Sequence, residues 1–141
     1  MKSNFLVLLA LFATSMFACA QPIKVPAAVT TAFHTRFPHA EAVKWGKENA
    51  KEYEAEFKEN NRSISANFGL DGNWVETETV IPVADLPAVV SAAIAKKYAG
   101  ATITMAEKTE MPGDKTLYEV AIKINGKKKS VELNPDGSFA N

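Results

Sequence analysis

Residues 53–74 read YEAEFKENNRSISANFGLDGNW, and this stretch decides the fold. Apolar and polar side chains alternate along it, which is typical of antiparallel strands with one buried and one solvated face. Asn60-Asn61 and later Asp71-Gly72 interrupt the alternation. Both pairs favour tight turns, because Asn and Gly tolerate a positive φ and Asp accepts hydrogen bonds from the turn backbone. The stretch therefore predicts a hairpin, followed by a turn into a strand that carries Trp74.

The same pattern returns 65 residues later, where residues 118–139 read YEVAIKINGKKKSVELNPDGSF. The segment before it also returns: VPAAVTTAFHTRFPHA (residues 25–40) corresponds to LPAVVSAAIAKKYAGA (residues 86–101). Apolar side chains in both segments recur at helical spacing. Pro26 and Pro87 stand where a helix begins, a position that suits proline. We interpret the chain as two copies of one unit.

The predicted fold class is α+β. It is a tandem repeat of two units, each a helix packed on a four-stranded antiparallel meander. We expect a signal peptide over residues 1–20, a first repeat over residues 21–82 and a second over residues 83–141. A unit of this size buries little apolar surface alone, so we expect the two repeats to form one domain.

The first residues predict export. Lys2 precedes FLVLLALFATSMFACA (residues 5–20), an apolar run followed by small residues, as in secretory signal peptides. Two interpretations of its end stay open. Ala18-Cys19-Ala20 suits cleavage before Gln21, which leaves a free secreted or periplasmic protein. Alternatively, Met16–Cys19 resembles a lipobox, which would leave Cys19 lipidated as in an outer-membrane lipoprotein. The remaining chain has no apolar run that could span a bilayer.

Composition and motifs exclude several classes of function. Lys+Arg and Asp+Glu are equal at 16 each, so nothing indicates nucleic-acid binding. The chain's one cysteine, Cys19, precedes the fold, which rules out disulfides and thiol catalysis there. His34 and His39 belong to no catalytic motif, and zinc requires more ligands than they supply. The Asp-Gly turns lack the oxygen-ligand pattern of a calcium loop. We therefore predict no enzyme, no cofactor and no metal.

The helical segment VPAAVTTAFHTRFPHAEAVKW, the stretch YEAEFKENNRSISANFGLDGNW and their second copies together carry a resemblance. Over about residues 21–141 the chain resembles the PepSY-like, beta-lactamase-inhibitor-like family of secreted bacterial proteins of the Bacteroidetes type. The resemblance implies two α+β units joined into a larger sheet with an open, concave face, and no established catalytic activity. In the similar beta-lactamase inhibitor protein, the concave sheet face holds an enzyme.

We predict that the binding surface is the polar sheet face opposite the helices. Its expected residues are Glu54, Glu56, Ser63, Ser65, Asn67, Glu119, Lys123, Ser130 and Glu132. Trp45 is added as a candidate contact anchor because the second copy has no aromatic residue there, with core packing as the alternative. The expected partner is an envelope protein that is bound or inhibited. The alternative is a small-ligand or envelope-stress sensing module with its ligand between the two units.

Overall fold

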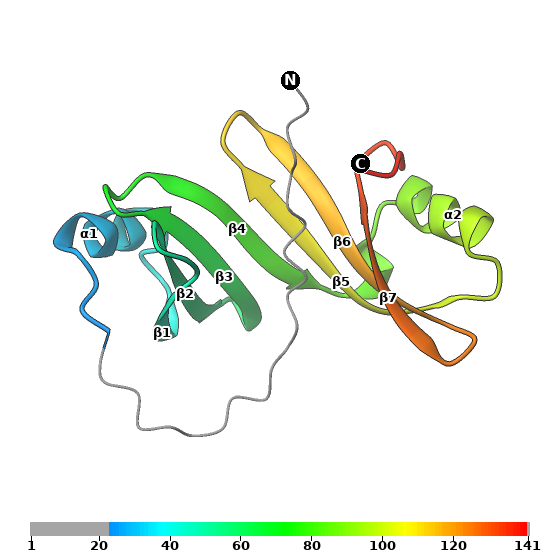
Figure 1. The fold of residues 1–141 in the computed structure, drawn as a ribbon, viewed down its shortest axis with the longest axis horizontal. Coiled ribbons are helices and arrows are strands. Elements are labelled where there is room, and N and C mark those ends of the chain that lie inside the picture. Colours follow the sequence, from blue (N-terminus) through cyan, green and yellow to red (C-terminus); the bar gives the residue numbers. More distant parts are fainter. Residues whose placement is uncertain (1–22, 141) are drawn as a thin grey trace.

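The computed structural model describes residues 23–140, so the predicted signal peptide and Cys19 lie outside the described residues. The elements in chain order are α1 (Ala27–Arg36), β1 (Glu41–Lys47), β2 (Glu52–Glu59), β3 (Arg62–Gly69), β4 (Trp74–Ile81), a 3-10 turn η1 (Val83–Asp85), α2 (Ala88–Lys97), β5 (Thr102–Met111), β6 (Lys115–Ile124) and β7 (Lys127–Leu133). The strands form one antiparallel sheet whose order follows the chain from β1 to β7, with α1 and α2 near opposite ends (Figure 1). The predicted α+β class is confirmed.

The helices and hairpins begin and turn where the sequence predicts. Pro26 and Pro87 directly precede α1 and α2, and each proline carbonyl accepts the first backbone hydrogen bonds of its helix. In the two-residue turn between β2 and β3, Asn60 and Asn61 have φ of 50° and 62°. The turn between β6 and β7 repeats this at Asn125-Gly126, with φ of 50° and 77°. These left-handed pairs match the right-handed twist of the strands they connect.

The two Asp-Gly segments are turns stabilised by the aspartate side chain. Asp71 Oδ1 accepts a hydrogen bond from the backbone N–H of Asn73 at 3.1 Å. Asp136 Oδ1 accepts the equivalent bond from Ser138 at 2.9 Å. The predicted role of Asp as a turn former is therefore confirmed.

The glycines of these turns set how closely the sheet approaches each helix. Gly72 has φ of +86°, and a Cβ added there would lie 2.7 Å from the backbone oxygen of Ala28 in α1. Gly137 has φ of +84°, and its added Cβ would lie 2.7 Å from the backbone oxygen of Val89 in α2. Both turns thus require glycine for its backbone angle and for its lack of a side chain.

Both helices pack on the same face of the sheet, each over its own core. The first core consists of Val29, Phe33, Phe37, Tyr53, Ala55, Phe57, Ala66 and Phe68. The second consists of Ile81, Leu86, Val90, Ile94, Ala106, Val120, Ile122, Val131 and Leu133. The first is mainly aromatic, with the Phe33 ring centre 5.1 Å from that of Phe57, whereas the second is aliphatic. The opposite side of the sheet, hereafter the open face, faces away from both helices.

One part of the predicted architecture is wrong. Within residues 23–140 the second half has three strands, and its expected fourth strand is only an isolated bridge between Leu133 and Phe139. The difference lies in pairing. In the first half, β4 is hydrogen-bonded to β3 on one side and to β5 on the other, which stabilises an eight-residue strand. The Phe139 segment pairs on one side, within the described residues, and its ring packs edge-on to Tyr98.

Candidate binding site on the open face of the sheet

The predicted residues of the first half lie side by side on the open face. Side chains alternate between the two faces of a strand. The residues between the core side chains of β2 and β3 therefore point away from the helices. Cross-strand pairing places Glu54 opposite Asn67 and Glu56 opposite Ser65. Ser63, opposite Lys58, lies at the hairpin end of the same face and is exposed.

The predicted residues of the second half share the same face on β6 and β7. Glu119 is paired with Glu132, and the Ser130 hydroxyl donates a 2.6 Å hydrogen bond to Glu119 Oε1. Lys123 is exposed at the hairpin end of β6, beside Lys128. The two halves of the predicted surface are connected by β4 and β5, whose contribution the sequence analysis did not include.

Trp45 does not belong to this face, so its inclusion there is wrong. It is paired with Ala55, which places its side chain on the helix side of the sheet. Its ring centre lies 5.1 Å from that of Phe33 in an edge-to-face contact, and the residue is partly buried against the first core. The tryptophan therefore extends the aromatic core, as the alternative interpretation held.

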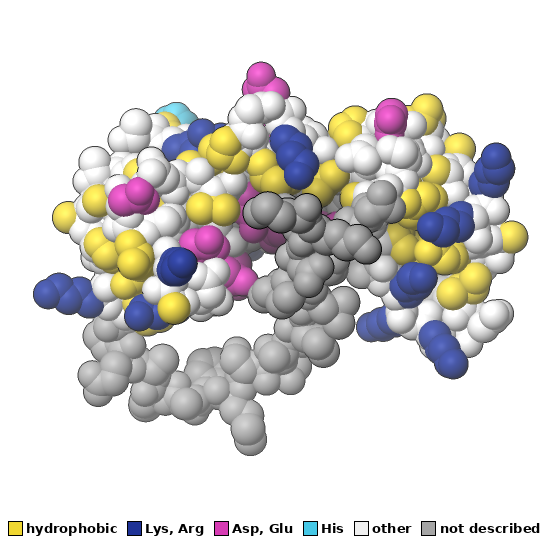
Figure 2. Space-filling view, turned by 45° about the horizontal axis from the view of Figure 1, so that its top comes forward, with side chains coloured by type: hydrophobic (Ala, Val, Ile, Leu, Met, Phe, Trp, Pro, Cys, Tyr) yellow, Lys and Arg dark blue, Asp and Glu magenta, His cyan; other side chains and the backbone are white. Residues whose placement is uncertain are grey.

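Sequence reasoning missed the central residues of the open face, which come from β4 and β5. Glu76 lies opposite Asn67 and Glu78 opposite Ser65, while Glu107 lies opposite Glu119. The alternation of Glu and Thr in ETET (residues 76–79) is the signal that indicates a glutamate face on β4. Six of the half-buried glutamates of the open face are here called the acidic patch: Glu54, Glu76, Glu78, Glu107, Glu119 and Glu132. Figure 2 shows acidic side chains close together near the middle of the molecule.

Hydrogen bonds satisfy only part of this polar surface. Asn67 Nδ2 donates to Glu76 Oε1 at 3.1 Å, and the Ser65 hydroxyl donates to Glu78 Oε2 at 3.3 Å. Asn67 is only 8% exposed, although both helices pack on the other side of the sheet. Its Oδ1 atom is buried and accepts no hydrogen bond within residues 23–140. A buried acceptor without a donor is costly, so this atom marks a place where a donor is missing.

The acidic patch also places negatively charged side chains opposite one another. Glu107, Glu119 and Glu132 are direct cross-strand neighbours in one row, an arrangement that is unfavourable when all three are ionised. The ion pairs formed within residues 23–140, Arg62–Asp85 and Lys108–Glu110, include no member of the patch.

Burial and neighbouring negative charges raise pKa values within the acidic patch. Burial, together with the negative charges of Glu76 and Glu107, raises the pKa of Glu78 to about 7, against the hydrogen bond from Ser65. Burial is also the main cause of raised pKa values at Glu54, Glu76 and Glu107. Desolvation and like charge both disfavour the ionised form of a carboxyl group. Near neutral pH the patch therefore carries negative charge that its surroundings destabilise.

Residues 23–140 contain no group of three or more His, Cys, Asp or Glu side chains that could hold a metal ion. His34 and His39 are both exposed, and the His34 ring packs edge-on to Phe33. No helix within these residues is long and apolar enough to cross a membrane.

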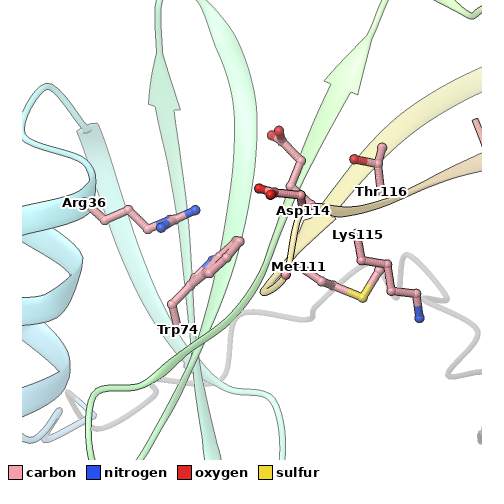
Figure 3. Close-up of a pocket in the computed structure, with 8 residues that line it drawn as sticks. Arg36, Trp74, Met111, Asp114, Lys115 and Thr116 are labelled. Carbon is pink, nitrogen blue, oxygen red and sulfur yellow. The ribbon is translucent and has the colours of Figure 1, made fainter.

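A cavity lies on the helix side, between the first half and the β5–β6 hairpin. Its volume is about 350 Å³, and its lining residues are Arg36, Trp74, Glu110, Met111, Gly113, Asp114, Lys115 and Thr116. The Arg36 guanidinium lies 3.4 Å from the centre of the Trp74 ring, and both side chains face the hairpin (Figure 3). A guanidinium on an indole face is a favourable cation–π pair. The cavity lining thus combines two cationic side chains, one aromatic plane and two carboxyl groups.

An α+β fold with one open antiparallel sheet face defines the class to which this chain belongs. Its sequence matches the family described as "Putative beta-lactamase-inhibitor-like, PepSY-like" over residues 20–65 and 51–140. The chain belongs to this family, which confirms the resemblance. No curated protein matches the sequence significantly.

Solved structures of Bacteroides proteins share the fold. One of the "putative periplasmic proteins" of Bacteroides eggerthii is 20% identical with a TM-score of 0.77, over 84% of this chain and 88% of that one. A DUF2874 family protein from Bacteroides uniformis is 22% identical with a TM-score of 0.77, over the same shares. A BLIP-like protein from Bacteroides fragilis is 24% identical with a TM-score of 0.73, over 84% and 85%. At these identities the likeness shows the fold alone.

Proposed function

We propose that this protein is a non-enzymatic binding module, secreted or periplasmic, that binds or inhibits a protein partner through the open face of its sheet. The observation that carries the proposal is the state of Asn67 and its surroundings. A buried acceptor lacks a donor there, beside glutamates that burial destabilises. A fold retains such unfavourable groups where they serve function, because their stability cost is offset on binding.

Two supporting expectations belong to the same proposal. Export is supported by the predicted signal peptide over residues 1–20 and by the description of the Bacteroides eggerthii structure as periplasmic. Duplication into repeats at residues 21–82 and 83–141 is supported by the matched contacts of Gly72 with α1 and Gly137 with α2. A duplicated unit would explain why both helices pack on one face and leave the whole opposite face free.

Affinity capture with paired variants tests the proposal. Residues 21–141 are immobilised, exposed to envelope extract of the organism that encodes the protein, and the retained proteins are identified by mass spectrometry. Ser65→Arg places a long side chain on the open face, whereas Ala95→Arg places the same side chain on the exposed side of α2. We expect a retained protein that Ser65→Arg loses and Ala95→Arg keeps. Equal retention by both variants would contradict binding through the open face.

A second candidate function is small-ligand sensing, favoured by the cavity between the two halves of the chain. In this case the ligand binds beside Arg36 and Trp74, and its binding raises the unfolding temperature. The test is a thermal-shift screen of small molecules against the native chain, Arg36→Ala and Ser65→Arg. A compound whose shift disappears in Arg36→Ala but persists in Ser65→Arg would assign function to the cavity. A compound with the reverse pattern would place the ligand on the open face.

A further inference from the structure

We propose that the partner of the open face presents lysine or arginine side chains from an extended segment, which the acidic patch and Asn67 receive. This inference rests on the proposed function and names the chemical class of its partner. Four observations lead to it: the placement of charge, the unsatisfied atom, the spread of the carboxylates and their proton affinity.

Acidic and basic side chains occupy different parts of the open face. The chain as a whole is balanced, with 16 basic and 16 acidic residues. The acidic patch nevertheless collects six carboxyl groups on β2 and β4–β7. Exposed lysines of the same face, among them Lys44, Lys58, Lys123 and Lys128, lie on the outer strand β1 or beside hairpin turns. A positively charged partner would be attracted to the middle of the face and repelled from its margins, which fixes its position.

The unsatisfied atom shows which group is missing. Asn67 lies between Glu54 and Glu76 in one cross-strand row, and its Nδ2 already donates a hydrogen bond to Glu76. Its remaining Oδ1 is an acceptor beside carboxylates, which are acceptors too. An ammonium or guanidinium group supplies several donors and a positive charge at once. Because Oδ1 is out of contact with solvent, a donor group reaches it only when neighbouring side chains of the patch move aside on binding.

The spread of the carboxylates favours an extended segment over a single ion. Neighbouring strands lie about 4.8 Å apart, so a row that runs from β5 to β7 spaces its carboxylates along a line. Glu107, Glu119 and Glu132 form such a row, and Glu54 and Glu76 flank Asn67 in another. No cluster suited to a metal ion exists within residues 23–140. Phosphate-bearing partners such as lipids and nucleic acids would be repelled by the same charges.

The proton affinity of the acidic patch makes the proposed binding depend on pH. The groups that surround Glu78 are Glu76 on its own strand, Ser65 on β3, Thr109 and Glu107 on β5 and Glu119 on β6. Every charged group among them is acidic, and the pKa of Glu78 is raised to about 7. A cationic partner should therefore bind more tightly at pH 8 than at pH 5.5, because protonation of the patch removes the attracting charge.

The test uses a fluorescein-labelled lysine octamer as the probe and fluorescence anisotropy as the measurement. Residues 21–141 are titrated into the probe at low salt, about 20 mM, where exposed charges are weakly screened. Glu107→Gln/Glu119→Gln removes two charges from the open face. Glu110→Gln/Asp114→Asn removes the same number from the cavity on the helix side. A glutamate octamer is the negative control for the probe.

We expect the native chain to bind the lysine octamer and not the glutamate octamer. The open-face double variant should weaken binding about tenfold, whereas the matched double variant should change it less than about twofold. Thermal unfolding checks the fold, and the open-face variant should remain at least as stable as the native chain because it removes repulsion.

Three results would overturn the inference. The first is no preference for the lysine octamer over the glutamate octamer, and the second is equal weakening by both double variants. The third is displacement of the probe by about 1 mM calcium beyond the effect of matched sodium chloride, which would assign the patch to a metal. If one of these occurs while Ser65→Arg still loses its captured partner, only the partner class is wrong. If Ser65→Arg also retains the partner, the proposed function fails with it.

Discussion

The two faces of the same strands differ in their contribution to the stability of the fold. Toward the helices, Ala55, Phe57 and Phe68 are at most 4% exposed and pack against α1. Glu54 adjoins Ala55 on β2 and Asn67 adjoins Phe68 on β3, but their side chains point to the open face. There, like charges are close together, and Asn67 Oδ1 accepts no hydrogen bond within residues 23–140. Apolar burial on the first face stabilises the fold. We expect the second face to lower stability at neutral pH, in keeping with the recognition role proposed for its residues.

The largest effect should come from the helix-side core. Phe33 is fully buried, and Phe33→Ala should lower the free energy of unfolding by about 3–5 kcal/mol, because it leaves a cavity among four aromatic rings. Urea denaturation measures the change. Ser63→Ala, an exposed substitution on the open face, should stay within about 0.5 kcal/mol. A comparable loss for both variants would contradict the contrast between the faces.

The next effect concerns the turn that holds the sheet against α1. Gly72→Ala should cost about 2–4 kcal/mol, because it combines a left-handed φ with a Cβ that collides with the Ala28 backbone. Gly126→Ala is the matched control: its φ is +77°, but an added Cβ meets nothing within 4 Å. The control should cost only about 1 kcal/mol. Equal losses in urea denaturation would mean that the close approach to the helix contributes nothing.

The glutamates of the open face should also make the stability of the fold depend on pH. Burial raises the pKa of Glu78 from 4.5 to about 7, and it also raises the pKa values of Glu54, Glu76 and Glu107. Between pH 4.5 and 7 the folded chain therefore binds more protons than the unfolded chain, so stability falls as pH rises. We expect a loss of about 1–2 kcal/mol between pH 5.5 and 8, after discounting for solvent screening. Stability that rises over this interval would contradict the account of the open face.

A smaller effect should come from neutralising Glu78 alone. Glu78→Gln should raise the free energy of unfolding at pH 8 by about 1 kcal/mol and flatten its pH dependence, because the amide carries no charge to desolvate. Glu56→Gln, on the exposed margin of the same face, serves as the control and should change stability by less than about 0.5 kcal/mol. If both variants behave alike, burial of Glu78 has no energetic consequence.

Local patterns predicted the turns and the alternation of faces, because those features depend on neighbouring residues. Asn125-Gly126 specifies its own backbone angles, and Asp71 accepts its hydrogen bond two residues along the chain. Trp45 was misplaced because it was chosen for its lack of an aromatic counterpart in the second copy, which does not show the face on which a side chain lies. Its face follows from the pairing with Ala55, after a register shift between Glu41 and Lys44, and no local sequence rule gives the position of such a bulge.

The acidic patch was only partly predictable for a related reason. Glu107 and Glu119 become neighbours through the pairing of β5 with β6, and Glu78 approaches them through the pairing of β4 with β5. A strand pattern shows which side chains share a face but not which strands lie side by side. The expected fourth strand at Phe139 failed for the same reason, since strand length depends on how many neighbours a segment finds.

The most direct test of the central claim, that the open face receives a cationic segment, is chemical-shift mapping by NMR. The lysine octamer is titrated into the labelled chain at pH 8, and the shifts of the Asn67 side-chain amide and the backbone amides are followed. The account predicts that the largest shifts cluster at Asn67, Glu78 and Glu107 on the open face. Shifts centred on Arg36 and Trp74 beside the helix-side cavity, with Asn67 unchanged, would contradict it.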